Sequence, residues 1–286
     1  MKAARPRGSG KLRHETIFNA QAQCPVIVVQ QAGQPARTPL AYHRACEFQL
    51  ILKGRGEYLI GGKKYAIRPN MVLALQPNQA HCYLPAPGGA HLKWLLMFAP
   101  EFLRAAALQR LAREAPAQAL LVETEAAALA LLFRQLHDEL TSRAQYWREI
   151  VRLKLGEFLW LLQRAGARPA PAPVVHPLAQ QIAEHLEREF TRPLDMAELA
   201  RRFGYSESHL AHVFKGHMRI SIKQYLLQRR IAEARRRMEE SPRLKAAAVA
   251  AEVGFHHYGL FQRKFKQWTG VTPAAYCRNA HPDCRI

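Results

Sequence analysis

The sequence has no long uninterrupted apolar run. A charged residue or a proline breaks each run before about 18 residues, the length that a membrane-spanning helix needs. The first fourteen residues hold five basic side chains, two glycines and a proline, with no apolar segment. We therefore expect a flexible arm there and no secretion signal, and we expect no membrane partner.

Cysteine is also scarce. The five cysteines show no paired spacing and stand at positions 24, 46, 82, 277 and 284. Their odd number and irregular spacing favour reduced thiols in the cytosol over a disulfide framework. Cys277, His281 and Cys284 lie close together, but no fourth ligand stands nearby, so we expect no zinc site there.

Acidic residues are few: 22 Asp and Glu face 42 Lys and Arg, which gives a formal charge of +20. Such a balance predicts affinity for polyanions, and for nucleic acid before membranes. Residues 178–286 carry 19 basic and 11 acidic side chains, and residues 1–177 carry 23 and 11. Since both halves are basic to a similar degree, charge alone does not locate a binding surface.

The C-terminal third contains an internal repeat. The segment ARRFGY at 200–205 is matched by AAEVGF at 250–255. Around each copy, apolar positions recur at helical spacing on both sides of a glycine-containing turn. This pattern predicts two helix-turn-helix units, at about 195–217 and 245–268.

Residues 221–240 connect the two units. The segment has no proline or glycine, is rich in helix formers and begins with Ser221, a favourable capping residue. Twenty helical residues span about 30 Å, and successive major grooves on one face of B-DNA lie about 34 Å apart. We therefore expect one rigid helix that places two recognition helices in successive grooves of one site.

The order of these motifs resembles the AraC/XylS family of bacterial transcription regulators. The resemblance rests on LAxxxGYS at 199–206, LxxxFK at 210–215, RIxxAR at 230–235, VGF at 253–255 and FKxxxGVTPxxY at 265–276. It implies that residues 178–280 bind double-stranded promoter DNA as one unit with two reading helices. It also implies a cytoplasmic, nucleoid-associated bacterial protein that works through RNA polymerase, most often as an activator.

The positions of a recognition helix opposite its apolar stripe face the groove. They predict these DNA contacts: Ser206, Glu207, Ser208, His212 and Lys215 in the first unit, and His257, Tyr258, Gln262, Arg263 and Lys266 in the second. Arg263 can pair bidentately with guanine and Gln262 with adenine, whereas lysines more often contact phosphates. We expect about half of these positions to touch only the DNA backbone or solvent.

The region from Val26 to Phe98 changes to short alternating strands separated by glycine and proline turns, which predicts a small barrel or sandwich. LxGxG at 52–56, followed by Gly62, Pro69 and PxxxH at 77–81, resembles the cupin-type effector domain of the same family. The expected fold has two domains. An N-terminal all-β cupin-like barrel with C-terminal helices precedes an all-α domain with two helix-turn-helix motifs joined by a linking helix.

The resemblance implies a small-molecule effector in the barrel, such as a sugar or another polar metabolite. We assign its binding to five polar or aromatic residues: His43, Glu47, Tyr58, His81 and Trp94. Metal-binding cupins use HxHx3E followed by a later His, and here Ala41 replaces the first His. We therefore expect no metal, no other cofactor and no catalytic residue.

Residues 123–165 are amphipathic and free of proline, which predicts two antiparallel helices packed on the barrel. In the resembled family such helices also form the dimer contact, so a homodimer is expected. Residues 166–177 contain four prolines and predict an extended linker. The predicted domains are thus 15–165 and 178–280.

Together these patterns predict a sequence-specific DNA-binding regulator, an activator, controlled by an effector in the barrel. Two alternatives stay open: a metal-dependent cupin enzyme fused to a DNA-binding domain, and a constitutive regulator without effector. Several residues depart from the family pattern, and two of the replacements in the DNA-binding domain are arginines. Arg219 replaces the glycine that closes the first recognition helix, and Arg237 replaces a leucine on the linking helix. Both suggest a DNA-binding domain of low stability by itself.

Overall fold

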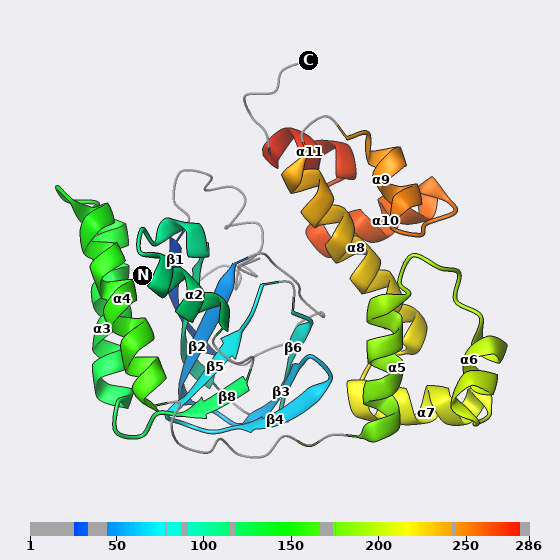
Figure 1. Ribbon diagram of the computed structural model, residues 1–286, viewed down its shortest axis with the longest axis horizontal. Helices are drawn as coiled ribbons and strands as arrows, with labels where there is room; N and C mark the ends of the chain where they lie inside the picture. The colour runs from blue at the N-terminus through cyan, green and yellow to red at the C-terminus, as the bar shows by residue number, and fades with distance from the viewer. Residues whose placement is uncertain are drawn as a thin grey trace, which may run out of the picture.

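The computed structural model describes residues 26–33, 45–77, 79–86, 91–114, 118–165, 174, 176–241 and 244–280 (Figure 1). A β-rich region precedes a helical region, which confirms the expected order of fold types. The expectations for the N-terminal arm, for His43 and for most of the 166–177 linker lie outside the described residues.

The N-terminal region consists of two antiparallel sheets, ordered β1-β7-β2-β5-β8 and β4-β3-β6. Their strands are β1 (Val26–Gly33), β2 (Cys46–Lys53), β3 (Gly56–Ile60), β4 (Lys63–Ile67), β5 (Met71–Leu75), β6 (His81–Pro85), β7 (His91–Phe98) and β8 (Gln118–Leu121). The expected Gly61-Gly62 turn joins β3 to β4, and both glycines adopt positive φ angles, 54° and 83°. Strand β8 was not foreseen from the sequence.

Alternation along the strands divides the N-terminal region into two cores. Phe48 of β2 and Leu96 of β7 face the outer core, which α3 (Ala126–Ser142) and α4 (Trp147–Ala165) cover as expected (Figure 1). The inner core lies between the two sheets and consists of aliphatic and tyrosine side chains, and Ile27, Leu95 and Met97 belong to a separate small cluster. Two further short helices follow the last long strand: η1 (Pro100–Phe102) and α2 (Ala106–Glu114).

The C-terminal region is all-helical. Its helices are α5 (Pro177–Arg188), α6 (Met196–Phe203), α7 (Glu207–Met218), α8 (Ile222–Glu240), α9 (Ala246–Glu252), α10 (Tyr258–Thr269) and α11 (Pro273–Ala280). Ser221 caps α8 with a complete capping box to Gln224. One apolar core packs on the first half of α8 and a second core packs on its last half.

The two regions meet in a shared apolar core. Leu59, Cys82 and Leu84 of the three-stranded sheet belong to the same buried cluster as Ile182 of α5 and Met218 of α7. Beside this cluster, the His217 ring hydrogen-bonds through Nε2 to the Gly62 carbonyl at 3.1 Å. The β3–β4 turn therefore contacts the last turn of α7. The extended linker expected from the sequence did not predict this contact between the two regions.

Among the described helices, none combines the length and apolar character that a bilayer-spanning segment needs.

Candidate nucleic-acid interface and ligand site

The first helix-turn-helix unit is built from local capping signals. Asp195 accepts hydrogen bonds from the backbone N–H groups of Ala197 and Glu198, at 2.8 and 3.2 Å, and so begins α6. Gly204 ends α6 in the left-handed region, at a φ of 73°. Ser206 then caps α7, as expected, by accepting from the His209 N–H at 3.3 Å.

The second unit has the same architecture with a different start to its recognition helix. Gly254 provides the left-handed turn residue, at a φ of 90°. Phe261 and Phe265 of α10 are completely buried and pack with Val253 from the turn. His257 occupies the N-cap position of α10, but its side chain makes no capping hydrogen bond.

The structure leaves most of the predicted reading positions available to a groove. Five exposed residues occupy the start and outer face of α7: Ser206, Glu207, Ser208, His212 and Lys215. Four occupy the same places on α10: His257, Gln262, Arg263 and Lys266. Tyr258 differs, because it is half-buried and stacks on Phe261 with ring centroids 5.9 Å apart.

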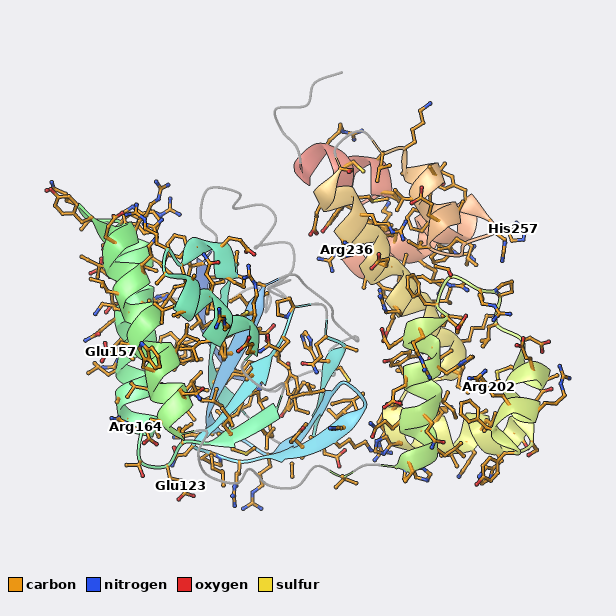
Figure 2. All side chains as sticks on the ribbon, in the orientation of Figure 1. Glu123, Glu157, Arg164, Arg202, Arg236 and His257 are labelled. Carbon is orange, nitrogen blue, oxygen red and sulfur yellow. The ribbon has the colours of Figure 1, made fainter. Side chains whose placement is uncertain are left out.

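The two recognition helices present their N-terminal ends on one side of the molecule. In Figure 1, α7 and α10 both begin at the edge away from the sheets and run back toward them. Figure 2 labels His257 and Arg202 along this same outer edge. Because a helix N-terminus carries partial positive charge, both ends favour an approaching phosphate.

Sequence reasoning missed an aromatic pair beside the first recognition helix. Tyr205 is 49% exposed and stacks on His209 with ring centroids 4.8 Å apart. The Gly-Tyr-Ser motif predicts that Tyr205 lies in a turn, but the motif does not predict that the Tyr205 ring lies on the exposed side of α7. The pair adds a flat surface next to Ser206 and Ser208.

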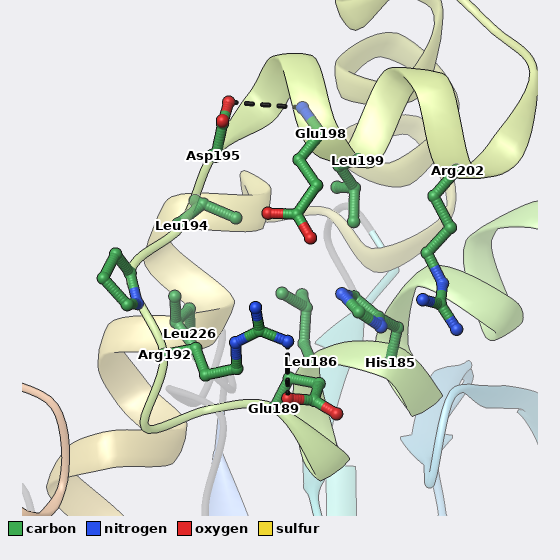
Figure 3. Close-up of a pocket in the computed structure, with 11 residues that line it drawn as sticks. His185, Leu186, Glu189, Arg192, Leu194, Asp195, Glu198, Leu199, Arg202 and Leu226 are labelled. Atoms are coloured by element: carbon green, nitrogen blue, oxygen red, sulfur yellow. Dashed lines mark hydrogen bonds and ion pairs between the residues drawn. The ribbon is translucent and has the colours of Figure 1, made fainter.

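A small pocket lies between α5, the α5–α6 loop and α6 (Figure 3). Polar residues that line it already have protein partners: Arg192 forms an ion pair with Glu189 at 3.5 Å, and Asp195 caps α6. Burial, followed by the charge of Arg202, lowers the pKa of His185 at its rim. The pocket contains none of the predicted reading residues.

The interior of the N-terminal region holds a buried polar cluster. Lys93 of β7 donates to Gln49 Oε1 at 2.7 Å, and the Gln49 amide donates to the Tyr58 hydroxyl at 2.6 Å and to Glu47. His81 Nε2 lies 3.7 Å from the second Glu47 oxygen. We call these five residues the barrel cluster; each is less than 10% exposed.

The ionisable groups of the barrel cluster are strongly perturbed by their surroundings. Burial lowers the pKa of Lys93 to about 8, and the nearby Glu47 carboxylate opposes that shift. Burial also raises the pKa of Tyr58 well above its usual value, and Glu47 adds to this effect. The Lys93 ammonium further lies over the rings of Tyr58 and Tyr83, with 5.9 and 5.6 Å to the centroids.

Of the predicted effector residues, the structure brings Glu47, Tyr58 and His81 together. It places Trp94 on the opposite face of the sheet, against Phe133 and His137 of α3. Gln49 and Lys93 were missed, although a lysine within the apolar strand HLKWLLMF was a visible signal. Within the part of the chain that the structure describes, no group of three His, Cys, Asp or Glu side chains could hold a metal ion.

Comparison with known protein families identifies both regions. The AraC-like ligand binding domain matches residues 25–159, and a helix-turn-helix domain matches residues 199–279. The chain belongs to the AraC family. The barrel cluster lies in the ligand-binding domain of this AraC-family protein, and α7 and α10 lie in its helix-turn-helix domain.

Curated relatives match about a third to two fifths of the chain. The transcriptional regulatory protein HptR of Staphylococcus aureus is 28% identical over 100 residues, which is 35% of this chain and 39% of HptR. The HTH-type transcriptional regulator GlxA of Rhizobium meliloti is 30% identical over 131 residues, which is 42% of this chain and 40% of GlxA. The chain thus spans about two fifths of the length of these relatives.

Among solved structures, ToxT from Vibrio cholerae with a bound unsaturated fatty acid is similar at a TM-score of 0.41 and 14% identity. That similarity covers 91% of this chain and 98% of ToxT.

Proposed function

We propose that this protein is a sequence-specific DNA-binding transcriptional regulator that a small polar effector controls from within the barrel. The observation that carries the proposal is the pair of recognition helices held on the two halves of α8, with both N-terminal ends on one side (Figure 1). Such a protein acts in the bacterial cytoplasm, at the nucleoid.

The dimensions of α8 support simultaneous binding of two grooves. The helix runs unbroken for 19 residues, which is about 28 Å at 1.5 Å per residue. Successive major grooves on one face of B-DNA are about 34 Å apart, so side chains that project from α7 and α10 can cover the remaining distance. The exposed Arg263 and Gln262 are the best candidates for reading bases in the second groove.

The composition of the barrel cluster supports a polar effector. Lys93 offers N–H donors, Glu47 offers carboxylate acceptors, and Gln49 and Tyr58 offer both, all within a desolvated interior. A sugar or a similar metabolite with several hydroxyl groups can replace these internal hydrogen bonds one for one. An aliphatic ligand would leave the same buried groups without partners, at a cost of about 1–3 kcal/mol each.

The shared core between the two regions supports a route from effector to DNA. The β3–β4 turn and the last turn of α7 touch through Gly62 and His217. Tyr58 lies on β3 itself, so a ligand that moves this strand also moves the contact with the first recognition helix. A ligand can shift the equilibrium only by its differential affinity for the two arrangements.

The proposal is tested by sequencing the genomic fragments that the purified protein retains. Neighbouring genes then nominate effectors, and DNA affinity is measured with each. We expect enrichment of a bipartite sequence and an affinity that changes with one polar metabolite in the wild type but not in Glu47→Gln. Enrichment without response to any nominated metabolite would instead indicate a constitutive regulator, and absence of enrichment would defeat DNA recognition itself.

The outer face of the α3–α4 pair supports homodimerisation as part of this proposal. Leu131 of α3 and Leu153 and Trp160 of α4 are 52%, 75% and 56% exposed. Apolar side chains gathered on one helical surface mark an interaction site more often than isolated ones do. A dimer through this face would present four recognition helices to a promoter, and contact with RNA polymerase would make the protein an activator.

A further inference from the structure

We propose that Arg230 is a positioning residue that sets the spacing at which the two recognition helices read DNA. This inference rests on the proposed function and concerns one question that the length of α8 leaves open. A single helix joins the two units end to end, but it does not by itself fix how each unit is rotated about that helix.

The loop between α5 and α6 leads into the first unit and contacts the second. Arg230, in the middle of α8, donates from Nε to the Phe190 carbonyl and from Nη2 to the Arg192 carbonyl, both at 2.6 Å. Phe190 is the side chain that packs against both apolar cores of the helical region. The loop therefore forms a second connection between the units, beside α8.

The turn of the second helix-turn-helix unit closes on the same loop. A Cβ atom at Gly254 would lie 2.5 Å from the Thr191 carbonyl oxygen and 3.0 Å from Arg230 Nε, so only glycine permits this approach. The Arg230 guanidinium also lies 5.9 Å from the centroid of the neighbouring Phe255 ring. We call this contact between Arg230, the 190–192 loop and Gly254 the loop clamp.

The burial of Arg230 argues for a geometric role and against a direct one. The residue is only 7% exposed, so its guanidinium does not reach a DNA phosphate. A buried cation is costly unless hydrogen bonds satisfy it, and here two backbone carbonyls do so in a fixed planar arrangement. Lysine offers a compact ammonium in place of this planar fork, so it cannot reproduce both bonds in the same geometry.

A rigid clamp has a measurable consequence on DNA. Each base pair added between two half-sites moves one of them by about 3.4 Å along the axis and about 35° around it. Two units locked together tolerate such a change poorly, because at least one base contact worth about 1–3 kcal/mol is lost. Two units that can rotate about α8 follow the displaced half-site and lose less.

The test uses the full-length protein and the bipartite site that it selects from genomic or random DNA. Affinity is measured on this site and on versions with one base pair added or removed between the half-sites. For the wild type we expect each change to weaken binding by about tenfold or more. For Arg230→Lys we expect a loss of less than about threefold on the altered spacings. Lys223→Arg, at an exposed position of the same helix, is the control and should keep the wild-type profile.

The outcomes separate this inference from the proposed function. If the wild type selects no bipartite DNA, the proposed function fails. If the wild type does so but Arg230→Lys binds more weakly by the same factor at every spacing, Arg230 only stabilises the fold and the inference is overturned. Gly254→Ala disturbs the loop clamp at another of its members and should likewise reduce the dependence of DNA affinity on half-site spacing. If neither variant folds, as judged by circular dichroism, the clamp serves stability alone and the inference is likewise overturned.

Discussion

Glu233 allows a quantitative prediction about the stability of the DNA-binding domain. Its buried carboxylate accepts from Arg229 at 3.3 Å, from Arg236 at 2.6 Å and from Arg237 at 3.1 Å. Arg229 also forms an ion pair with Glu187 of α5 at 2.7 Å, and Arg237 forms one with Glu252 of α9. One carboxylate thus stands at the centre of a charged network that joins α5 and α9 to α8.

The size of the effect follows from the pKa of Glu233. Burial alone would raise this pKa, but the hydrogen bonds from Arg236 and Arg237, followed by the charges of Arg229 and Arg236, outweigh it and lower the pKa from 4.5 to about 2. At 1.36 kcal/mol per unit, the ionised form contributes about 3 kcal/mol to folding. Because the pKa of the folded state is the lower one, this contribution is present above pH 4.5 and is lost as the pH falls toward 2.

The perturbation is Glu233→Gln, which keeps the shape and removes the charge. Hydrogen exchange of the α8 amides at pH 7 should accelerate by up to about a hundredfold, as expected for a loss of about 3 kcal/mol. The α4 amides should not change. Glu149→Gln is the control, because Glu149 is exposed and its ion pair with Arg152 at 3.0 Å is worth less than about 1 kcal/mol.

Two results would refute this reasoning. One is an acceleration of less than about threefold in α8 at pH 7, which would mean that the carboxylate contributes little net free energy. The other is a difference between wild type and Glu233→Gln that persists unchanged at pH 2, where the wild-type carboxyl is about half protonated and its contribution to folding is mostly lost. Thermal unfolding at the two pH values gives an independent measurement of the same difference.

Three further predictions concern other parts of the molecule. Arg219→Gly should raise the melting temperature by removing a strain of about 1 kcal/mol, since Arg219 has a φ of 60°; a lower melting temperature would show that its side-chain contacts outweigh the strain. Arg263→Ala should weaken DNA binding by about 1–3 kcal/mol and relax the preference at one base position, and an unchanged preference in a selection experiment would exclude it as a base-reading residue. Leu153→Glu combined with Trp160→Glu should convert a dimer to a monomer in mass measurements at micromolar concentration, and a dimer that persists would move the interface elsewhere.

The sequence was most informative where structure depends on neighbours along the chain. The repeat gave both helix-turn-helix units, and Ser206 and Ser221 cap the helices that they were expected to cap. Capping, glycine turns and the apolar period of a helix act within a few residues, so a single sequence contains the whole cause. For the same reason, the exposed face of α7 could be assigned in advance.

The polar interior of the barrel was predicted less well. Trp94 was assigned to the effector site, but it faces α3, and its neighbour Lys93 faces inward instead. Adjacent residues of a strand point to opposite faces, and which face is the inner one depends on how distant strands pair. Gln49 and Lys93 are 44 residues apart in the chain, and their contact was not visible in it.

What the sequence by itself determined was therefore the kind of protein and the location of the helices of its two helix-turn-helix units. Only the tertiary structure decided how those helices are fixed relative to each other and to the barrel. Arg237, which the sequence marked as a weakness, binds Glu233 and Glu252, and His217 reaches a carbonyl 155 residues away. These contacts arise when separately folded segments pack together, so their geometry is a property of the whole chain and not of any one stretch of it.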